Sequence, residues 1–174
     1  AAIAGPPTAR CLILVSPDAQ RTMATYLGIS VELGPEDVDH ELIRRAKVLY
    51  LEGYLWDSPA AKQAFVEAAE TARAAGAKVA LTLSDPFCVE RHRASFRGLV
   101  EGHVDLLFAN EAEIISLYEC NSFEEALQQV RGHCEIAALT RSEKGSVILA
   151  GEEVHQVEAI QVGELVDTTG AGDL

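Results

Sequence analysis

The sequence predicts an α/β protein with a doubly wound, mainly parallel β-sheet. Short apolar runs over residues 47–51, 78–83, 104–109 and 135–139 have the length and composition of buried strands. Amphipathic segments long enough to be helices lie between these runs, and strands that alternate with such helices form right-handed βαβ units.

A β-hairpin is expected ahead of this sheet. Residues 10–16 form a leucine-rich and β-branched run, residues 17–19 predict a turn, and residues 21–27 alternate like a returning strand. An ordinary edge hairpin explains these residues as well as a functional element does. We expect two parts, a hairpin segment over residues 1–30 and an α/β core over residues 31–174.

Helix signals separate the predicted strands. Residues 34–37 (GPED) predict a helix that runs to about Ala46, because proline is tolerated in the first turn and acids suit the positive helix end. Ser58-Pro59 predicts the start of a helix over residues 59–75, with Phe65 and four alanines on one stripe. Further helices are expected over residues 87–100, 110–118 and 122–130, and strands over 146–150, 153–157 and 160–166.

Composition limits the classes of partner. A formal net charge of -13 argues against a nucleic-acid surface or an anionic membrane surface, although backbone amides and a metal ion can still hold a small nucleotide. No apolar run approaches the length of a membrane span. Four scattered cysteines without a CxxC pair indicate neither zinc nor disulfides, so a reducing cytoplasm is expected.

The last nine residues, VDTTGAGDL, carry the most specific chemical signal. Gly170-Ala171-Gly172 lets the backbone come close to a ligand, and the free N–H groups of a helix starting there would favour an anion. Asp173 would stand beside that anion. Phosphoryl transfer needs both parts, because one holds the developing charge and the other accepts the proton of the attacking hydroxyl. A glycine-rich turn with an acidic neighbour is the plainer alternative.

Polar or glycine residues follow four of the predicted strands. In an open α/β sheet, ligands bind outside the carboxyl ends of the strands, although loops are also polar simply because they face water. Asn110 and Glu113 have the spacing of a helix capping box. We expect Asp85 to cap the next helix and Trp56 to be a partly buried core residue.

The string DTTGAGD over residues 167–173 resembles the signature of the ribokinase-like (PfkB) family of carbohydrate and nucleoside kinases. Residues 17–23 (PDAQRTM), 53–57 (GYLWD) and 140–146 (TRSEKGS) resemble other motifs of the family, closest in type to its adenosine-kinase-like members. The resemblance covers nearly the whole chain. It implies a ribokinase-like fold, in which the hairpin is part of a small β lid, and a chain truncated at both ends.

The resemblance also implies an activity: ATP-dependent, Mg²⁺-assisted phosphorylation of a hydroxymethyl group on a sugar or nucleoside. Asp173 would be the catalytic base, and residues 170–172 would supply the anion-hole amides. Asn110 would contact the ATP phosphates, and Glu113 would orient water around Mg²⁺.

Thr140 and Gly145 would contact the nucleotide through a loop whose middle glycine is replaced here by Ser142.

Two other functions stay open. Gly170-x-Gly172 is half of a dinucleotide-binding fingerprint, which would suit an oxidoreductase, although its late position tells against this. The chain could also be a non-catalytic fragment or a nucleotide-binding module. A homodimer through the exposed edge of the hairpin is a further expectation.

Overall fold

The structure is a computed structural model that describes residues 5–160, 163, 166–167 and 169–170. Two compact units divide the chain. The described residues up to Glu32 and those from Ile160 onward belong to the first unit, and Leu33–Ala159 form the second.

The first unit contains the expected hairpin. Strands β1 (Arg10–Val15) and β2 (Arg21–Tyr26) pair antiparallel, and the 3₁₀ turn η1 (Gly28–Glu32) follows them. Asp18 Oδ1 accepts hydrogen bonds from Ser16 Oγ and from the amide of Gln20, which closes the turn between the strands. Dimerisation through this hairpin stays a prediction.

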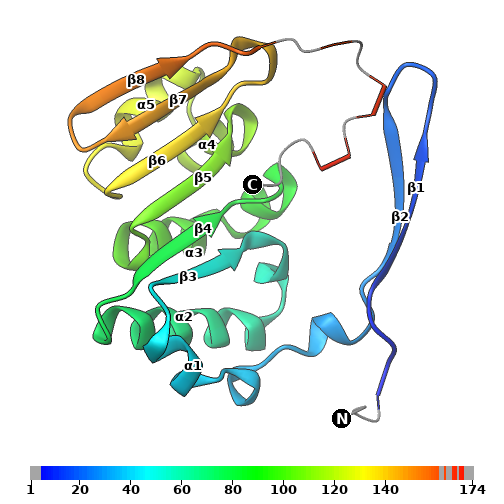
Figure 1. The fold of residues 1–174 in the computed structure, drawn as a ribbon, viewed down its shortest axis with the longest axis vertical. Coiled ribbons are helices and arrows are strands. Elements are labelled where there is room, and N and C mark those ends of the chain that lie inside the picture. Colours follow the sequence, from blue (N-terminus) through cyan, green and yellow to red (C-terminus); the bar gives the residue numbers. More distant parts are fainter. Residues whose placement is uncertain (1–4, 161–162, 164–165, 168, 171–174) are drawn as a thin grey trace. The chain divides into compact units, whose positions relative to one another are not determined.

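The second unit is built on a six-stranded sheet in the order β3-β4-β5-β6-β7-β8 (Figure 1). The first three pairings are parallel and the last two are antiparallel, which confirms the predicted mainly parallel α/β class. The strands are β3 (Val48–Glu52), β4 (Lys78–Thr82), β5 (Leu106–Asn110), β6 (Ile136–Thr140), β7 (Ser146–Ala150) and β8 (Glu153–Val157).

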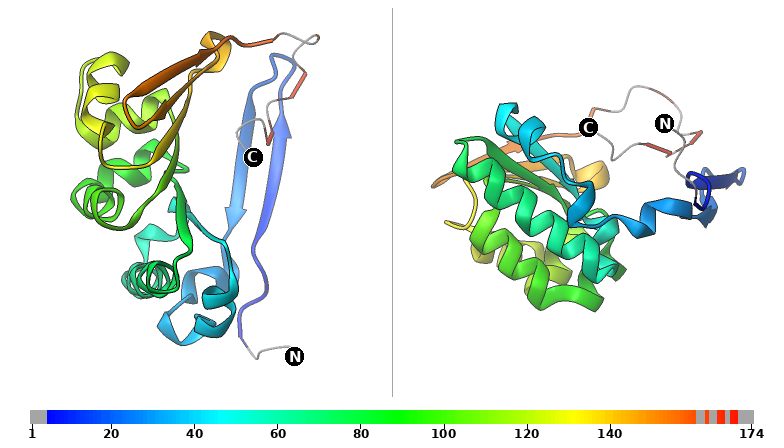
Figure 2. Two further views of the ribbon diagram at one scale, coloured as in Figure 1. Left: turned by 60° about the vertical axis from the view of Figure 1, so that its left-hand side comes forward. Right: turned by 90° about the horizontal axis from the view of Figure 1, so that it is seen from below.

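Four helices connect the parallel strands: α2 (Pro59–Ala74), α3 (Pro86–His103), α4 (Glu111–Tyr118) and α5 (Phe123–Val130). The strands follow one another in sequence order, so right-handed crossovers place all four helices on one face of the sheet. These four helices therefore do not show the doubly wound arrangement, with helices on both faces, that the sequence predicted. The two views of Figure 2 show this arrangement. Helix α1 (His40–Arg45) packs against α2.

The core of this unit lies between the sheet and these helices. In β5 and β6, alternate residues are buried because successive side chains of a strand point to opposite faces. Helix α2 buries Phe65 and the predicted alanine stripe. The largest fully buried side chains are Phe96, Leu81, Leu83, Leu107, Ile114, Leu117 and Leu139.

Caps fix the starts of the helices as the sequence indicated. Ser58 accepts from the amide of Ala61 at 3.4 Å, and Asp85 accepts from the amide of Phe87 at 3.1 Å. The Asp85 contact confirms the expected capping role. None of the helices in the described residues is long and apolar enough to cross a bilayer.

Three predicted elements differ from the structure. The helix expected over residues 34–46 is interrupted, because Asp39 accepts from the amide of Leu42 at 2.9 Å and so starts α1 anew after the short η2 (Pro35–Asp37). Helix α3 has non-helical backbone angles at His92.

The strand expected over residues 160–166 is not formed at Ile160, Gly163 or Val166, the residues of that segment that the structure describes. The exposed fractions of Ile160 and Val166 are 84% and 73%. Apolar periodicity alone does not make a strand there, because these described residues join no hydrogen-bonded ladder. The other four residues of the segment lie outside the described part.

Candidate active site at the carboxyl edge of the sheet

Two of the predicted nucleotide residues are neighbours at the carboxyl ends of β5 and β6. Asn110 is the last residue of β5 and Thr140 the last of β6, and the two are partners in the parallel register. Thr140 also pairs with Ser146 of β7. Parallel strands end at the same edge, which is where α/β sheets bind ligands.

Asn110 and Glu113 form a complete capping box at the start of α4. The amide of Glu113 donates to Asn110 Oδ1 at 2.8 Å, and the amide of Asn110 donates to Glu113 Oε2 at 2.9 Å. Asn110 Nδ2 donates to Glu113 Oε1, also at 2.9 Å. Within the described residues, the second N–H of the Asn110 side-chain amide makes no hydrogen bond and can donate to a ligand.

Glu113 is buried, with an exposed fraction of 5%. Burial raises the pKa of its carboxyl group above the ordinary 4.5, while the hydrogen bond from the Asn110 amide acts in the opposite direction. Asp85 adds a second negative charge nearby, which also raises this pKa. A bound cation would relieve both effects.

The geometry suits Mg²⁺ held through water. Both carboxylate oxygens of Glu113 already accept hydrogen bonds from Asn110, and within the described residues no group of three or more His, Cys, Asp or Glu side chains could hold a metal ion directly. Mg²⁺ commonly keeps several waters and takes its other ligands from substrate phosphates. The donor set fits the water-orienting role that the family resemblance implies for Glu113, and that role stays a prediction.

The raised pKa of Glu113 predicts a pH effect on stability. A carboxyl group of this kind contributes most while protonated, below about pH 4.5, and its contribution falls as pH rises through the raised pKa. The free energy of unfolding of the wild type, minus that of Glu113→Gln, should decline as the pH rises above 4.5. Urea unfolding at several pH values checks this, and a difference that grows with pH would contradict it.

The tips of β3 and β4 are joined directly. The amide of Gly53 donates to Ser84 Oγ at 3.0 Å, and a Cβ at Gly53 would lie 2.5 Å from the carbonyl oxygen of Leu83. Ser84 has a φ of 68°, the left-handed region that non-glycine residues rarely adopt. Such backbone persists where the surroundings hold it, and it is frequent at ligand sites.

The loop between β6 and β7 contains a non-glycine residue, Ser142, in the left-handed backbone conformation that favours glycine. Its 3₁₀ turn η4 (Ser142–Lys144) is closed by a 2.7 Å hydrogen bond from the amide of Arg141 to the carbonyl oxygen of Gly145. Ser142, which replaces the middle glycine of the family's loop, has a φ of 53°. The loop thus keeps a left-handed residue at this position in spite of the substitution.

Replacing Ser142 by glycine should stabilise the protein by about 0.5–1 kcal/mol, because the left-handed cost of a non-glycine residue exceeds the extra entropy that glycine loses on folding. The hydrogen bond that the Ser142 side chain makes with Glu143 is at an exposed carboxylate, which water can satisfy after the substitution. Ser84→Gly is the matched control. It also relieves a positive φ but removes the acceptor of the Gly53 amide, so it should destabilise the fold. Urea unfolding measures the free energy of unfolding of both variants, which should rise for Ser142→Gly and fall for Ser84→Gly. Equal changes in the two variants would contradict the difference that we assign to the Gly53–Ser84 hydrogen bond.

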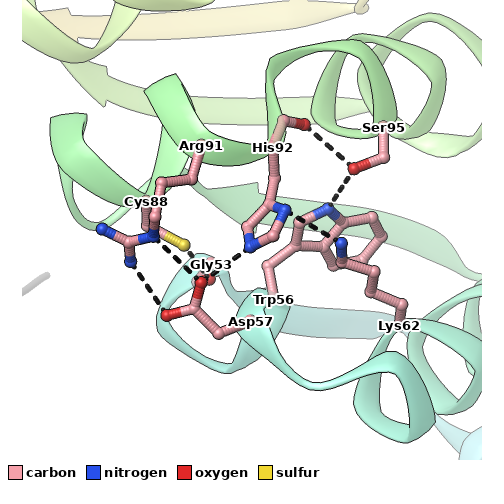
Figure 3. Close-up of polar contacts among 8 residues, drawn as sticks. All are labelled: Gly53, Trp56, Asp57, Lys62, Cys88, Arg91, His92 and Ser95. Carbon is pink, nitrogen blue, oxygen red and sulfur yellow. Dashed lines mark hydrogen bonds and ion pairs between the residues drawn. The ribbon is translucent and has the colours of Figure 1, made fainter.

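A charged cluster that the sequence did not predict lies beside the β3 and β4 tips (Figure 3). Asp57 accepts from Arg91 Nη2 at 2.9 Å and from His92 Nε2 at 2.7 Å. The hydrogen bond from Arg91 is the main cause of the lowered pKa of Asp57. His92 Nδ1 must accept the 3.1 Å hydrogen bond from Lys62, because an ammonium group only donates.

Trp56 is a core residue, as expected, and is more deeply buried than the sequence indicated. Its exposed fraction is 2%, and its ring packs against those of Phe65 and Phe96 with centroids 5.7 and 5.1 Å away. Its Nε1 donates to Ser95 Oγ at 2.8 Å (Figure 3). The ring is therefore not available to stack on a base.

The C-terminal signature is described only in part. Asp167 Oδ1 accepts from both the amide and the hydroxyl of Thr169 at 2.8 Å, and these hydrogen bonds lower the pKa of Asp167. Gly170 is exposed and has a φ of 76°, as a turn through glycine requires. Ala171, Gly172 and Asp173 lie outside the described residues, so their predicted roles stay predictions.

Comparison with known proteins places this arrangement in context. The profile of the pfkB family carbohydrate kinases matches residues 2–174. A probable sugar kinase from Rhizobium etli CFN 42 is 53% identical with a TM-score of 0.92, covering 98% of this chain and 52% of that chain. Adenosine kinase from Sinorhizobium meliloti is 51% identical with a TM-score of 0.91, at the same coverage of both chains.

A third relative also matches nearly all of this chain but only about half of its own length. ATP-dependent ribose-1-phosphate kinase from Halopiger xanaduensis is 29% identical, over 95% of this chain and 51% of that protein. The chain therefore spans about half the length of the relatives that it matches.

Proposed function

Because the chain belongs to the pfkB family of carbohydrate kinases, we propose that the protein transfers the γ-phosphate of ATP to a hydroxymethyl group of a sugar or nucleoside. The observation that carries the proposal is the register that sets Asn110, at the N-terminus of α4, beside Thr140 at one sheet edge. The two motifs that the resemblance assigns to phosphate and nucleotide are thus neighbours in space.

Each residue has a defined part in the proposed reaction. The remaining N–H of Asn110 donates to a phosphate oxygen, and Thr140 and the loop ending at Gly145 hold the nucleoside part of ATP. Glu113 accepts hydrogen bonds from the waters of Mg²⁺, which offsets charge on the phosphates.

Asp173 takes the proton of the acceptor hydroxyl, and the amides of residues 170–172 stabilise the charge on the transferred phosphoryl group. In-line transfer of this kind depends on positioning and electrostatics more than on covalent chemistry by the protein. These roles need no redox cofactor.

The proposal is tested by assaying the complete gene product with a panel of phosphoryl acceptors. ADP formation from ATP and Mg²⁺ is measured with adenosine, ribose, fructose and ribose 1-phosphate. Adenosine should react fastest, since a structural relative that is 51% identical is an adenosine kinase. ATP should also raise the melting temperature while NAD does not. Turnover with none of the four acceptors, together with a shift by NAD alone, would overturn the proposal.

A further inference from the structure

The side chain of Arg141 fastens the β6–β7 loop to the two helices that follow β5. Its Nη2 lies 3.0 Å from Glu111 Oε1, at the start of α4, and 3.6 Å from Glu124 Oε1 of α5. The guanidinium carbon lies 3.9 Å from the ring centroid of Phe123, whose exposed fraction is 2%. Only 18% of the Arg141 side chain is exposed.

Glu111 sits where a negative charge is unfavourable for nucleotide binding. It directly follows Asn110, at the helix end that would face the phosphates. Arg141 is the main cause of the lowered pKa of Glu111, and Lys144 Nζ lies 3.4 Å from each of its carboxylate oxygens. The carboxylate is therefore ionised but paired with two cations.

The same arginine holds the shape of the loop. The Arg141 amide donates to the carbonyl oxygen of Gly145, and the guanidinium is fixed on Glu111 and Phe123 at the other end of the residue. In the part of the chain that the structure describes, Arg141 Nε is buried without a hydrogen-bond partner, so the guanidinium is held by Glu111, Glu124 and Phe123 alone.

We propose that Arg141 is a positioning residue of the nucleotide site, which fixes the Thr140–Gly145 loop against α4 and offsets the charge of Glu111 beside the phosphates. This inference rests on the proposed function. It predicts that Arg141 acts on ATP and not on the acceptor, and that its effect passes through Glu111.

The test compares five variants of the complete gene product: Arg141→Met, Arg141→Lys, Arg131→Met, Glu111→Gln and the double variant Glu111→Gln/Arg141→Met. Arg141→Met should raise the dissociation constant and the KM of MgATP about tenfold, the size expected for losing one charge-assisted contact. The kcat at saturating ATP and the KM of the acceptor should change less than threefold. Arg141→Lys should lie between, because lysine keeps the charge but lacks the planar fork.

Arg131→Met is the matched control. Arg131 also carries a buried, unpartnered Nε and an ion pair, with Glu152 at 3.5 Å, but it follows α5 at the amino edge of the sheet. Its replacement should leave the KM of MgATP unchanged even where the melting temperature falls. A merely structural role of Arg141 would make the two variants alike.

The double variant Glu111→Gln/Arg141→Met gives the decisive comparison. If Arg141 acts through Glu111, Arg141→Met weakens MgATP binding less in the Glu111→Gln background than in the wild type, and Glu111→Gln alone supplies the reference for that background. Independent, multiplying losses would overturn the inference, and so would wild-type affinity in Arg141→Met. Either result leaves the kinase proposal intact when the wild type binds MgATP. A wild type that binds no MgATP overturns both.

Discussion

Replacing Asp173 by asparagine is expected to lower kcat by about 10²–10⁴-fold, the contribution of a general base positioned at the reacting hydroxyl. Asparagine keeps the size of the side chain but accepts no proton at neutral pH. The dissociation constant of MgATP should stay within about twofold of wild type, since the proposed phosphate and nucleoside contacts come from other residues. Steady-state kinetics and calorimetric titration of MgATP give both quantities.

Asp39→Asn is the control for this substitution. Asp39 is the N-cap of α1, a position at which asparagine caps as well as aspartate, so neither turnover nor stability should change. Equal turnover of wild type and Asp173→Asn would remove Asp173 from the mechanism. A loss of MgATP binding equal to the loss of kcat would show that the residue binds nucleotide instead.

Replacing Gly145 by alanine is expected to destabilise the protein by about 3 kcal/mol or more, because strain and overlap act together. Gly145 has a φ of 83°, and an added Cβ would lie 2.0 Å from the carbonyl oxygen of Val157 and 2.8 Å from the amide nitrogen of Ala159. These contacts are with backbone, so the loop itself must move. Nucleotide affinity should fall together with stability.

Gly76→Ala separates the steric overlap of an added Cβ from the backbone strain of a positive φ. Gly76 has a φ of 78°, but an added Cβ there would meet no atom within 4 Å. Its replacement should cost about 1 kcal/mol, the left-handed penalty alone. Urea unfolding of both variants measures the difference, and equal losses at the two positions would contradict the close approach of the loop to the end of β8.

Local patterns in the sequence predicted most of the sheet and its caps. Apolar runs of five or six residues became the parallel strands β3 to β6, because such short runs bounded by turn signals are typical of buried strands. The spacing of Asn110 and Glu113 predicted their capping box, since both partners lie within one turn of helix. Alternation of strand and helix predicted a mainly parallel sheet, but the order of its strands, and with it the pairing of Asn110 with Thr140, came from the structure.

Contacts between distant residues were not predictable in this way. Asp57 meets Arg91 and His92 from another helix, 34 and 35 positions along the chain, and no local spacing indicates such a pair. The same holds for Arg141 and Glu111. The interruption at Asp39 was missed because acidic and proline residues near position 35 also suit the start of one continuous helix.

The structure of the protein with Mg²⁺ and a non-hydrolysable ATP analogue tests the central claim most directly. The account predicts phosphates at the N-terminus of α4, with the Asn110 side chain within hydrogen-bond distance of a phosphate oxygen, a water between Glu113 and the metal, and the nucleoside against Thr140 and Gly145. A nucleotide bound away from the carboxyl ends of β5 and β6 would contradict it.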